Sequence, residues 1–171
     1  MILKGFKEKS IKKYFNKLLE NRVLTDNSKP IESLGVILDY SEISQVETLE
    51  NLSKTLKINS VKFKVVAFNT AKDYEQGLCP VFSEDDFDWK GQIKTAELKA
   101  FLNTPFDALI SYYFKDDLHL KLLTAMSEAK FKIGVLQEEP KLNDLIIATD
   151  SKAFEVFKSE LLKYLSILKR I

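Results

Sequence analysis

The residues of this chain that could take part in chemistry follow its apolar segments, at the points where buried strands would end. Polar side chains come directly after four of these segments: Asp39, Tyr40 and Ser41; Asn69 and Thr70; Ser111, Tyr112 and Tyr113; and Gln137 and Glu138. In open parallel sheets, ligands bind outside the carboxyl ends of the strands, where the strand order reverses. Asp39 beside Ser111 and Tyr112 could therefore orient a ribose, a sugar hydroxyl or a Mg²⁺ ion, with Tyr40 and Asn69 completing a ligand site.

The same residues also have a structural interpretation. Asp39 followed by Glu42 has the spacing of a helix-capping box, Ser111 is small enough to pack in a core, and the tyrosines could cover a sheet edge. Neither Gly-x-Gly-x-x-Gly nor Gly-x-x-x-x-Gly-Lys follows any predicted strand. The turn after residue 38 has no glycine that would let a pyrophosphate approach the backbone, so we expect no dinucleotide and no other cofactor.

An acidic stretch over residues 86–97 resembles a calcium loop of the EF-hand type. Asp86, Asp88, Gly91 and Glu97 occupy loop positions one, three, six and twelve. Lys90, however, stands where an oxygen ligand belongs, and its ammonium group would repel the ion. The alternative is a solvated acidic loop, and we expect no metal site there.

His119 is the only histidine and Cys79 the only cysteine. A site with several histidines is therefore excluded within one chain, and any catalytic Ser-His-Asp or Cys-His arrangement must use His119. His119 lies in the predicted helix at residues 117–129, which favours a packed or partly exposed side chain. Cys79 could be a reactive thiol, although cysteines are more often small buried apolar residues.

Two similar halves of the chain must position these residues. Each half consists of an apolar strand, an amphipathic helix and a second apolar strand, over residues 34–68 and 106–136. Runs of Val, Ile, Leu and Phe without polar alternation are typical of strands buried on both faces. The pattern predicts strands at 34–38, 61–68, 107–112 and 131–136, and helices at 5–20, from 39 to about 57, 96–102, 117–129 and 151–169.

The predicted fold is a single α/β domain over residues 1–171, a three-layer sandwich with a Rossmann-like, mostly parallel sheet of about five strands. Residues 70–94 form an irregular acidic insertion. The segment before residue 145 is too short for a crossover helix, so the apolar run 145–148 is expected to pair antiparallel or to lie at a sheet edge.

The first helix is basic and amphipathic. Residues 1–22 hold seven Lys and Arg against two Glu, a net charge of +5 in a chain whose total is +1. The helix could cover the sheet with its lysines solvated, or pack against a second copy of itself. It could also lie on an anionic membrane surface, although it has no Trp, or touch nucleic acid, which the near-neutral total charge disfavours.

Length and composition indicate a globular protein. The chain has 171 residues, of which 45% are hydrophobic and 30% charged. One cysteine is compatible with a reducing compartment, and we see neither a signal peptide nor an apolar run long enough to span a bilayer. A cytoplasmic location is expected.

Two resemblances add to this interpretation. Residues 106–135 resemble a strand-helix-strand unit in the acceptor domain of heptosyltransferase-type glycosyltransferases, in the Phe106-Asp107 opening, the Leu-rich helix and the strand with Gly134. The whole chain resembles a family of small bacterial proteins of unknown function, in residues 2–7, 89–91, 106–113 and 142–147. The first implies a Rossmann-like layer, and the second implies no activity.

No motif combines the residue types and spacing that a known chemistry demands, and a fold alone does not specify an activity. We expect a non-enzymatic α/β domain that acts through a protein partner or self-association. The alternative is a protein or enzyme that binds a small sugar-like or nucleotide-like molecule at the strand ends.

Overall fold

The computed structural model describes residues 2–24, 28–70 and 77–171. Parts of the predicted loop at 21–33 and of the predicted insertion at 70–94 lie outside these ranges. The helices are α1 (Ile2–Glu20), α2 (Val46–Thr55), α3 (Ala96–Leu102), α4 (Leu118–Met126) and α5 (Phe154–Ile167). The strands are β1 (Leu34–Asp39), β2 (Phe63–Phe68), β3 (Val81–Phe82), β4 (Ala108–Tyr112), β5 (Lys132–Gly134) and β6 (Leu145–Ile146). The predicted helices and long strands are confirmed in order and type, and most of their ends shift by up to three residues, while those of α3 coincide. The helix predicted from residue 39 differs, because it begins as a 3-10 helix (Tyr40–Gln45) and α2 starts only at Val46.

Within the described ranges, six strands form one sheet in the order β3-β2-β1-β4-β5-β6, and every pairing is parallel. This is the strand order of Rossmann folds, in which the order reverses between the first and fourth strands. The predicted α/β fold with a Rossmann-like sheet is therefore confirmed. The sheet has one strand more than expected, because β3 is only two residues long and leaves no periodic signal.

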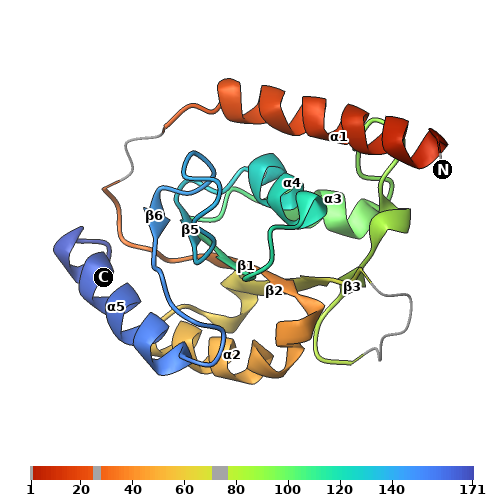
Figure 1. The fold of residues 1–171 in the computed structure, drawn as a ribbon. Coiled ribbons are helices and arrows are strands. Elements are labelled where there is room, and N and C mark those ends of the chain that lie inside the picture. Colours follow the sequence, from red (N-terminus) through yellow and green to blue (C-terminus); the bar gives the residue numbers. More distant parts are fainter. Residues whose placement is uncertain (1, 25–27, 71–76) are drawn as a thin grey trace.

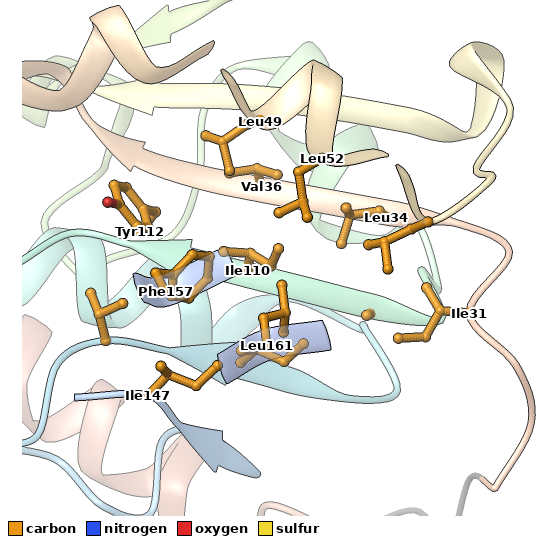
Figure 2. Packing of buried hydrophobic residues seen from close by; sticks show 14 of the residues in the cluster. Ile31, Leu34, Val36, Leu49, Leu52, Ile110, Tyr112, Ile147, Phe157 and Leu161 are labelled. Atoms are coloured by element: carbon orange, nitrogen blue, oxygen red, sulfur yellow. The ribbon is translucent and has the colours of Figure 1, made fainter. Parts of the chain in front are cut away.

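The helices cover both faces of the sheet (Figure 1). Helices α2 and α5 lie on one face, and α3 and α4 lie on the other. Helix α1 packs on the outside of α4 and adds an outer layer to the predicted three-layer sandwich. Each face has its own hydrophobic core, and β1 is buried on both faces along its whole length. Figure 2 shows the core on the α2 and α5 side, where Leu49, Leu52 and Phe157 pack over Val36 and Ile110.

Strand β6 lies at the sheet edge as expected, but its predicted antiparallel pairing is wrong. It runs parallel to β5, with Ile133 opposite Leu145 and Gly134 opposite Ile146. A three-residue strand is only about 10 Å long. The short segment between β5 and β6 can therefore return along the edge without a crossover helix.

Candidate functional site

The strand order reverses between β1 and β4, and polar groups gather where these two strands end. Leu38 lies opposite Tyr112 in the β1–β4 register, so Asp39 follows at the same edge. The Asp39 carboxylate accepts a hydrogen bond from the Ser41 amide at 2.9 Å and lies 3.3 Å from the Lys115 ammonium group. Asp39 thus caps the 3-10 helix Tyr40–Gln45 that precedes α2, which agrees with the capping role that the sequence predicts for it.

Glu42 and Tyr112 complete this group, which we call the switch-point cluster (Asp39, Glu42, Tyr112 and Lys115). Burial raises the pKa of Glu42, and the Asp39 carboxylate raises it further while Lys115 opposes the change. Burial also raises the pKa of Tyr112 to about 12, with a smaller contribution from Glu42. The Tyr112 hydroxyl is buried and has no hydrogen-bond partner among the described residues. In Figure 2 its oxygen points away from Ile110.

Ser111 does not join the switch-point cluster. Its hydroxyl lies 2.8 Å from that of Thr124 on α4, and the Tyr113 hydroxyl lies 2.8 Å from the same Thr124 oxygen. Successive side chains of a strand point to opposite faces of the sheet. Ser111 therefore faces α4, whereas Tyr112 packs in the core beside Phe154 and Phe157 of α5.

The remaining two predicted residues lie around the same edge. Asn69 is buried just after β2, and its backbone amide donates to the Phe82 carbonyl at 2.8 Å. Tyr40 is half-buried and packs against the core under α2. Sequence reasoning missed Lys115, which stands only three residues beyond Tyr112, and assigned Glu42 only to capping.

The charge of the switch-point cluster limits its ligands. At a helix N-terminus that binds phosphate, free backbone amides point toward the anion. Here the Asp39 carboxylate already accepts the hydrogen bond of one such amide, that of Ser41, and Glu42 adds a second acidic group nearby. The arrangement suits a neutral ligand rich in hydroxyl groups and disfavours a nucleotide phosphate.

The acidic stretch that resembles a calcium loop is a tight hairpin turn. Asp88 Oδ1 accepts from the amides of Lys90 at 2.7 Å and Gln92 at 2.8 Å, and Gly91 adopts a φ of +81°. Asp86 accepts from the Ser83 amide at 2.8 Å and from the Thr95 hydroxyl. Turn formation thus accounts for the aspartates and the glycine at these spacings. Within residues 2–24, 28–70 and 77–171, no three His, Cys, Asp or Glu side chains are grouped to hold a metal ion.

His119 and Cys79 have packed surroundings. His119 lies in the first turn of α4, stacked on Phe68 at 5.4 Å and edge-on to Phe87 at 5.0 Å. Burial lowers its pKa, although Asp117 and Glu84 oppose this. Burial raises the pKa of the Cys79 thiol to about 11, so little reactive thiolate forms at neutral pH.

Helix α1 presents a basic surface to solvent. Ile11 and Phe15 are buried against α4, so the side chains on the opposite side of the helix face outward. An open hollow of about 1120 Å³ runs along this side. The basic residues that line it are Lys9, Lys12, Lys13 and Lys17 of α1, with Lys90 from the hairpin turn; Glu20 is the acidic residue in its wall. We call this surface the α1 basic face.

Gly91 brings the hairpin turn to the α1 basic face. A Cβ atom at this position would lie 3.2 Å from Leu122 of α4 and 3.3 Å from Tyr14 of α1. The left-handed backbone conformation also favours glycine. The turn therefore fits into the angle between the two helices, and Lys90 reaches the lysines of α1.

Exposed apolar side chains adjoin the α1 basic face. Ile2, Leu3 and Phe6 in the first two turns of α1 are 77%, 67% and 63% exposed, and Trp89 beside Lys90 is 57% exposed. No helix in the described part of the chain is long and apolar enough to cross a membrane.

Comparison with known proteins identifies one family. A family of unknown function, DUF6913, matches residues 7–168. This confirms the predicted resemblance to a family of unknown function. No curated protein and no solved structure matches the chain.

Proposed function

The chain belongs to the family of unknown function DUF6913, and we propose that it is a binding domain that docks on an acidic surface through the α1 basic face. The observation that carries this proposal is the gathering of five lysines from two distant segments around one open hollow. The α1 lysines and Lys90 are separated by more than 70 residues of sequence, and the fold places them side by side.

The lysines of this face have no salt-bridge partner within residues 2–24, 28–70 and 77–171. In the part of the chain that the structure describes, none of Lys9, Lys12, Lys13, Lys17 and Lys90 forms a salt bridge. Other exposed lysines do, such as Lys62 with Glu32 and Lys163 with Glu160. A concentration of uncompensated positive charge attracts an acidic partner over roughly one Debye length, about 8 Å at physiological salt.

The polar groups at the strand ends, and the one histidine, are engaged in structural contacts. Asp39 is engaged by Ser41 and Lys115, and Ser111 is engaged by Thr124. The one histidine is packed between two phenylalanines. These groups stabilise the fold in their present contacts, whereas no salt bridge among the described residues involves a lysine of α1.

Reversing two charges on the α1 basic face tests the proposal. We expect the double variant Lys9→Glu, Lys13→Glu to elute from immobilised heparin, a generic polyanion, at a much lower salt concentration than the unmodified chain. Both side chains are exposed, so the melting temperature should change little. The measurement is the eluting salt concentration together with thermal unfolding.

The matched control is Lys54→Glu, Lys152→Glu, which changes the same charge on the α2 and α5 side of the sheet. Both of these lysines are also exposed. Equal elution of the two double variants would show that retention depends on net charge alone, and the proposal would fail.

The Tyr112 hydroxyl, which has no hydrogen-bond partner in the described part of the chain, favours a second candidate function. This function is the binding of a sugar-like or nucleoside-like molecule at the switch-point cluster. A buried hydroxyl without a partner is a group that a ligand could satisfy. Lys115 and Asp39 would then donate to and accept from the ligand's hydroxyl groups. Asp39, Tyr40, Asn69 and Tyr112 are the predicted residues that remain near such a site.

A thermal-shift screen of sugars, nucleosides and nucleotides tests this second candidate. A ligand at 100 times its dissociation constant stabilises the folded protein by about 2.7 kcal/mol, which raises the melting temperature by several degrees. We expect Asp39→Ala to abolish this shift while costing about 1 kcal/mol as a lost helix cap. A shift that persists in Asp39→Ala would place the ligand elsewhere.

A further inference from the structure

We propose that the acidic surface recognised by the α1 basic face is an anionic lipid bilayer, on which α1 lies with its apolar first turns inserted among the headgroups. This inference rests on the proposed function and names its partner. Its evidence is the combination, on one helix and its neighbouring turn, of exposed apolar side chains with uncompensated lysines.

The geometry of α1 suits a flat partner. Ile2, Phe6, Lys9 and Lys13 follow one another at spacings of four, three and four residues, so they form one line along the helix. This line lies opposite the buried side chains of Ile11 and Phe15. Because α1 is the outermost layer of the protein, a planar surface can reach the line without meeting the sheet or the other helices (Figure 1).

The exposed apolar residues distinguish a bilayer from other acidic surfaces. A nucleic-acid backbone is bound by cations and would leave Ile2, Leu3 and Phe6 in water. A bilayer interface binds both the apolar side chains and the lysines. The apolar groups enter the boundary of the acyl chains, while the lysines remain among the headgroups. Trp89 strengthens the match, since tryptophan is enriched at the headgroup level of membranes.

The type of basic residue agrees with this choice. The basic residues of α1 are all lysines; the nearby Arg22 already pairs with Asp144 at 2.7 Å. Arginine suits planar two-pronged recognition of one carboxylate or phosphate, whereas lysine is a mobile point charge. Mobile charges suit a fluid layer of anionic headgroups, to which each nearby lysine adds about fivefold in affinity.

The one tryptophan of the chain provides an internal probe. We expect the full chain to cosediment at least ten times more strongly with vesicles of phosphatidylcholine and phosphatidylserine than with phosphatidylcholine alone. Binding should shift the Trp89 fluorescence to shorter wavelength as the indole leaves water. Lys9→Glu, Lys13→Glu should weaken binding at least tenfold.

An apolar substitution separates insertion from charge attraction. Phe6→Ser should weaken vesicle binding about fivefold to tenfold without changing retention on heparin. Its matched control is Val61→Ser, because Val61 is 80% exposed and lies just before β2, away from α1. Both substituted side chains are exposed, so the melting temperatures of the two variants report whether the fold is intact.

The outcomes separate the two proposals. Retention on heparin without vesicle binding would overturn the lipid inference and leave the binding face standing, with an acidic protein or nucleic acid as its partner. Vesicle binding with an unshifted Trp89 and equal effects of Phe6→Ser and Val61→Ser would overturn insertion. Failure in both assays would overturn the inference and the proposed function together.

Discussion

Replacing Asp107 with alanine should lower the free energy of unfolding by about 3 kcal/mol at neutral pH. Asp107 immediately precedes β4 and ties it to both neighbouring strands. One carboxylate oxygen accepts from the amide and hydroxyl of Ser33 before β1, at 3.1 and 2.9 Å. The other accepts from the ammonium group of Lys130 before β5, at 2.8 Å. Alanine would remove the acceptor of the Ser33 amide and hydroxyl and the charge opposite Lys130.

The pH dependence identifies the cause. Burial by itself raises the pKa of Asp107. The hydrogen bonds from Lys130, Ser33 and the Glu32 amide together lower the pKa by more than burial raises it, so the pKa lies below its ordinary value of 3.8. A lowered carboxyl pKa stabilises the folded state above the ordinary pKa, and this stabilisation is lost as the pH falls through the folded value. The free energies of unfolding of Asp107→Ala and the unmodified chain, measured by urea unfolding, should therefore become more similar as the pH falls toward 3.

Two further variants serve as comparisons for Asp107. Asp107→Asn keeps an acceptor for Ser33 but loses the charge opposite Lys130, so its effect should be intermediate. Asp85→Ala removes an exposed carboxylate and should change stability by less than about 0.5 kcal/mol. A loss for Asp107→Ala as small as that for Asp85→Ala would contradict its role as a clamp between strands.

Replacing Lys132 with methionine should raise the free energy of unfolding at pH 7, by up to about 3 kcal/mol. Lys132 lies in β5 with only 4% of its surface exposed. Its ammonium group donates to the Ala125 carbonyl at 3.3 Å. Burial, and then the nearby Arg22 charge, lower its pKa to about 8, although Asp144 opposes the change. Methionine has a similar length and carries no charge that must leave water.

The sign of the Lys132 effect can be checked with pH. An unfolded lysine keeps its proton up to about pH 10.5, whereas the folded one loses it near pH 8. Between these values the unfolded state binds more protons, so the stability of the unmodified chain should rise with pH. The excess in the free energy of unfolding of Lys132→Met over that of the unmodified chain, measured by urea unfolding, should accordingly decrease between pH 8 and 10.

Lys54→Met, at an exposed position of α2, is the control and should show no such trend. If Lys132→Met instead destabilises the protein at pH 7, the hydrogen bond to Ala125 and the attraction of Asp144 outweigh the cost of burial. The comparison thus decides between the two contributions at this site.

Several charged side chains of this protein make contacts that stabilise the sheet. Asp107 holds the amino ends of β1, β4 and β5 together, and Asp144 holds the β5–β6 edge by accepting from the Lys132 backbone amide. Asp39 and Lys115 neutralise each other at the opposite end of the sheet. Among the described residues, no lysine of α1 forms a salt bridge of this kind.

The sequence by itself determined the order and type of the long elements, because their signal is local. A continuous apolar run predicts a strand buried on both faces, and β1 is buried at every position. The helical spacing of six apolar residues predicts the inner side of α5: Phe154, Phe157, Leu161, Tyr164, Leu165 and Leu168. Four of them are buried, but Tyr164 and Leu168 are exposed. The cap at Asp39 is also a local feature, because its carboxylate accepts from the Ser41 amide two residues further on. Thr95 has the residue type of an N-cap before α3, but its hydroxyl donates to Asp86 and not to its own helix.

Only the tertiary structure decided which distant residues meet. The two-residue strands β3 and β6 are too short for a periodic pattern, and their pairing depends on the edges that the longer strands leave open. Ser111 and Tyr112 are adjacent in sequence, yet the alternation of β4 and the packing of α4 and α5 assign them to opposite faces. The α1 basic face joins Lys9 to Lys90 only because Gly91 lets the hairpin turn fit between α1 and α4. Such contacts depend on how separate elements pack in space, so they cannot be predicted from the local spacing of residues in the sequence.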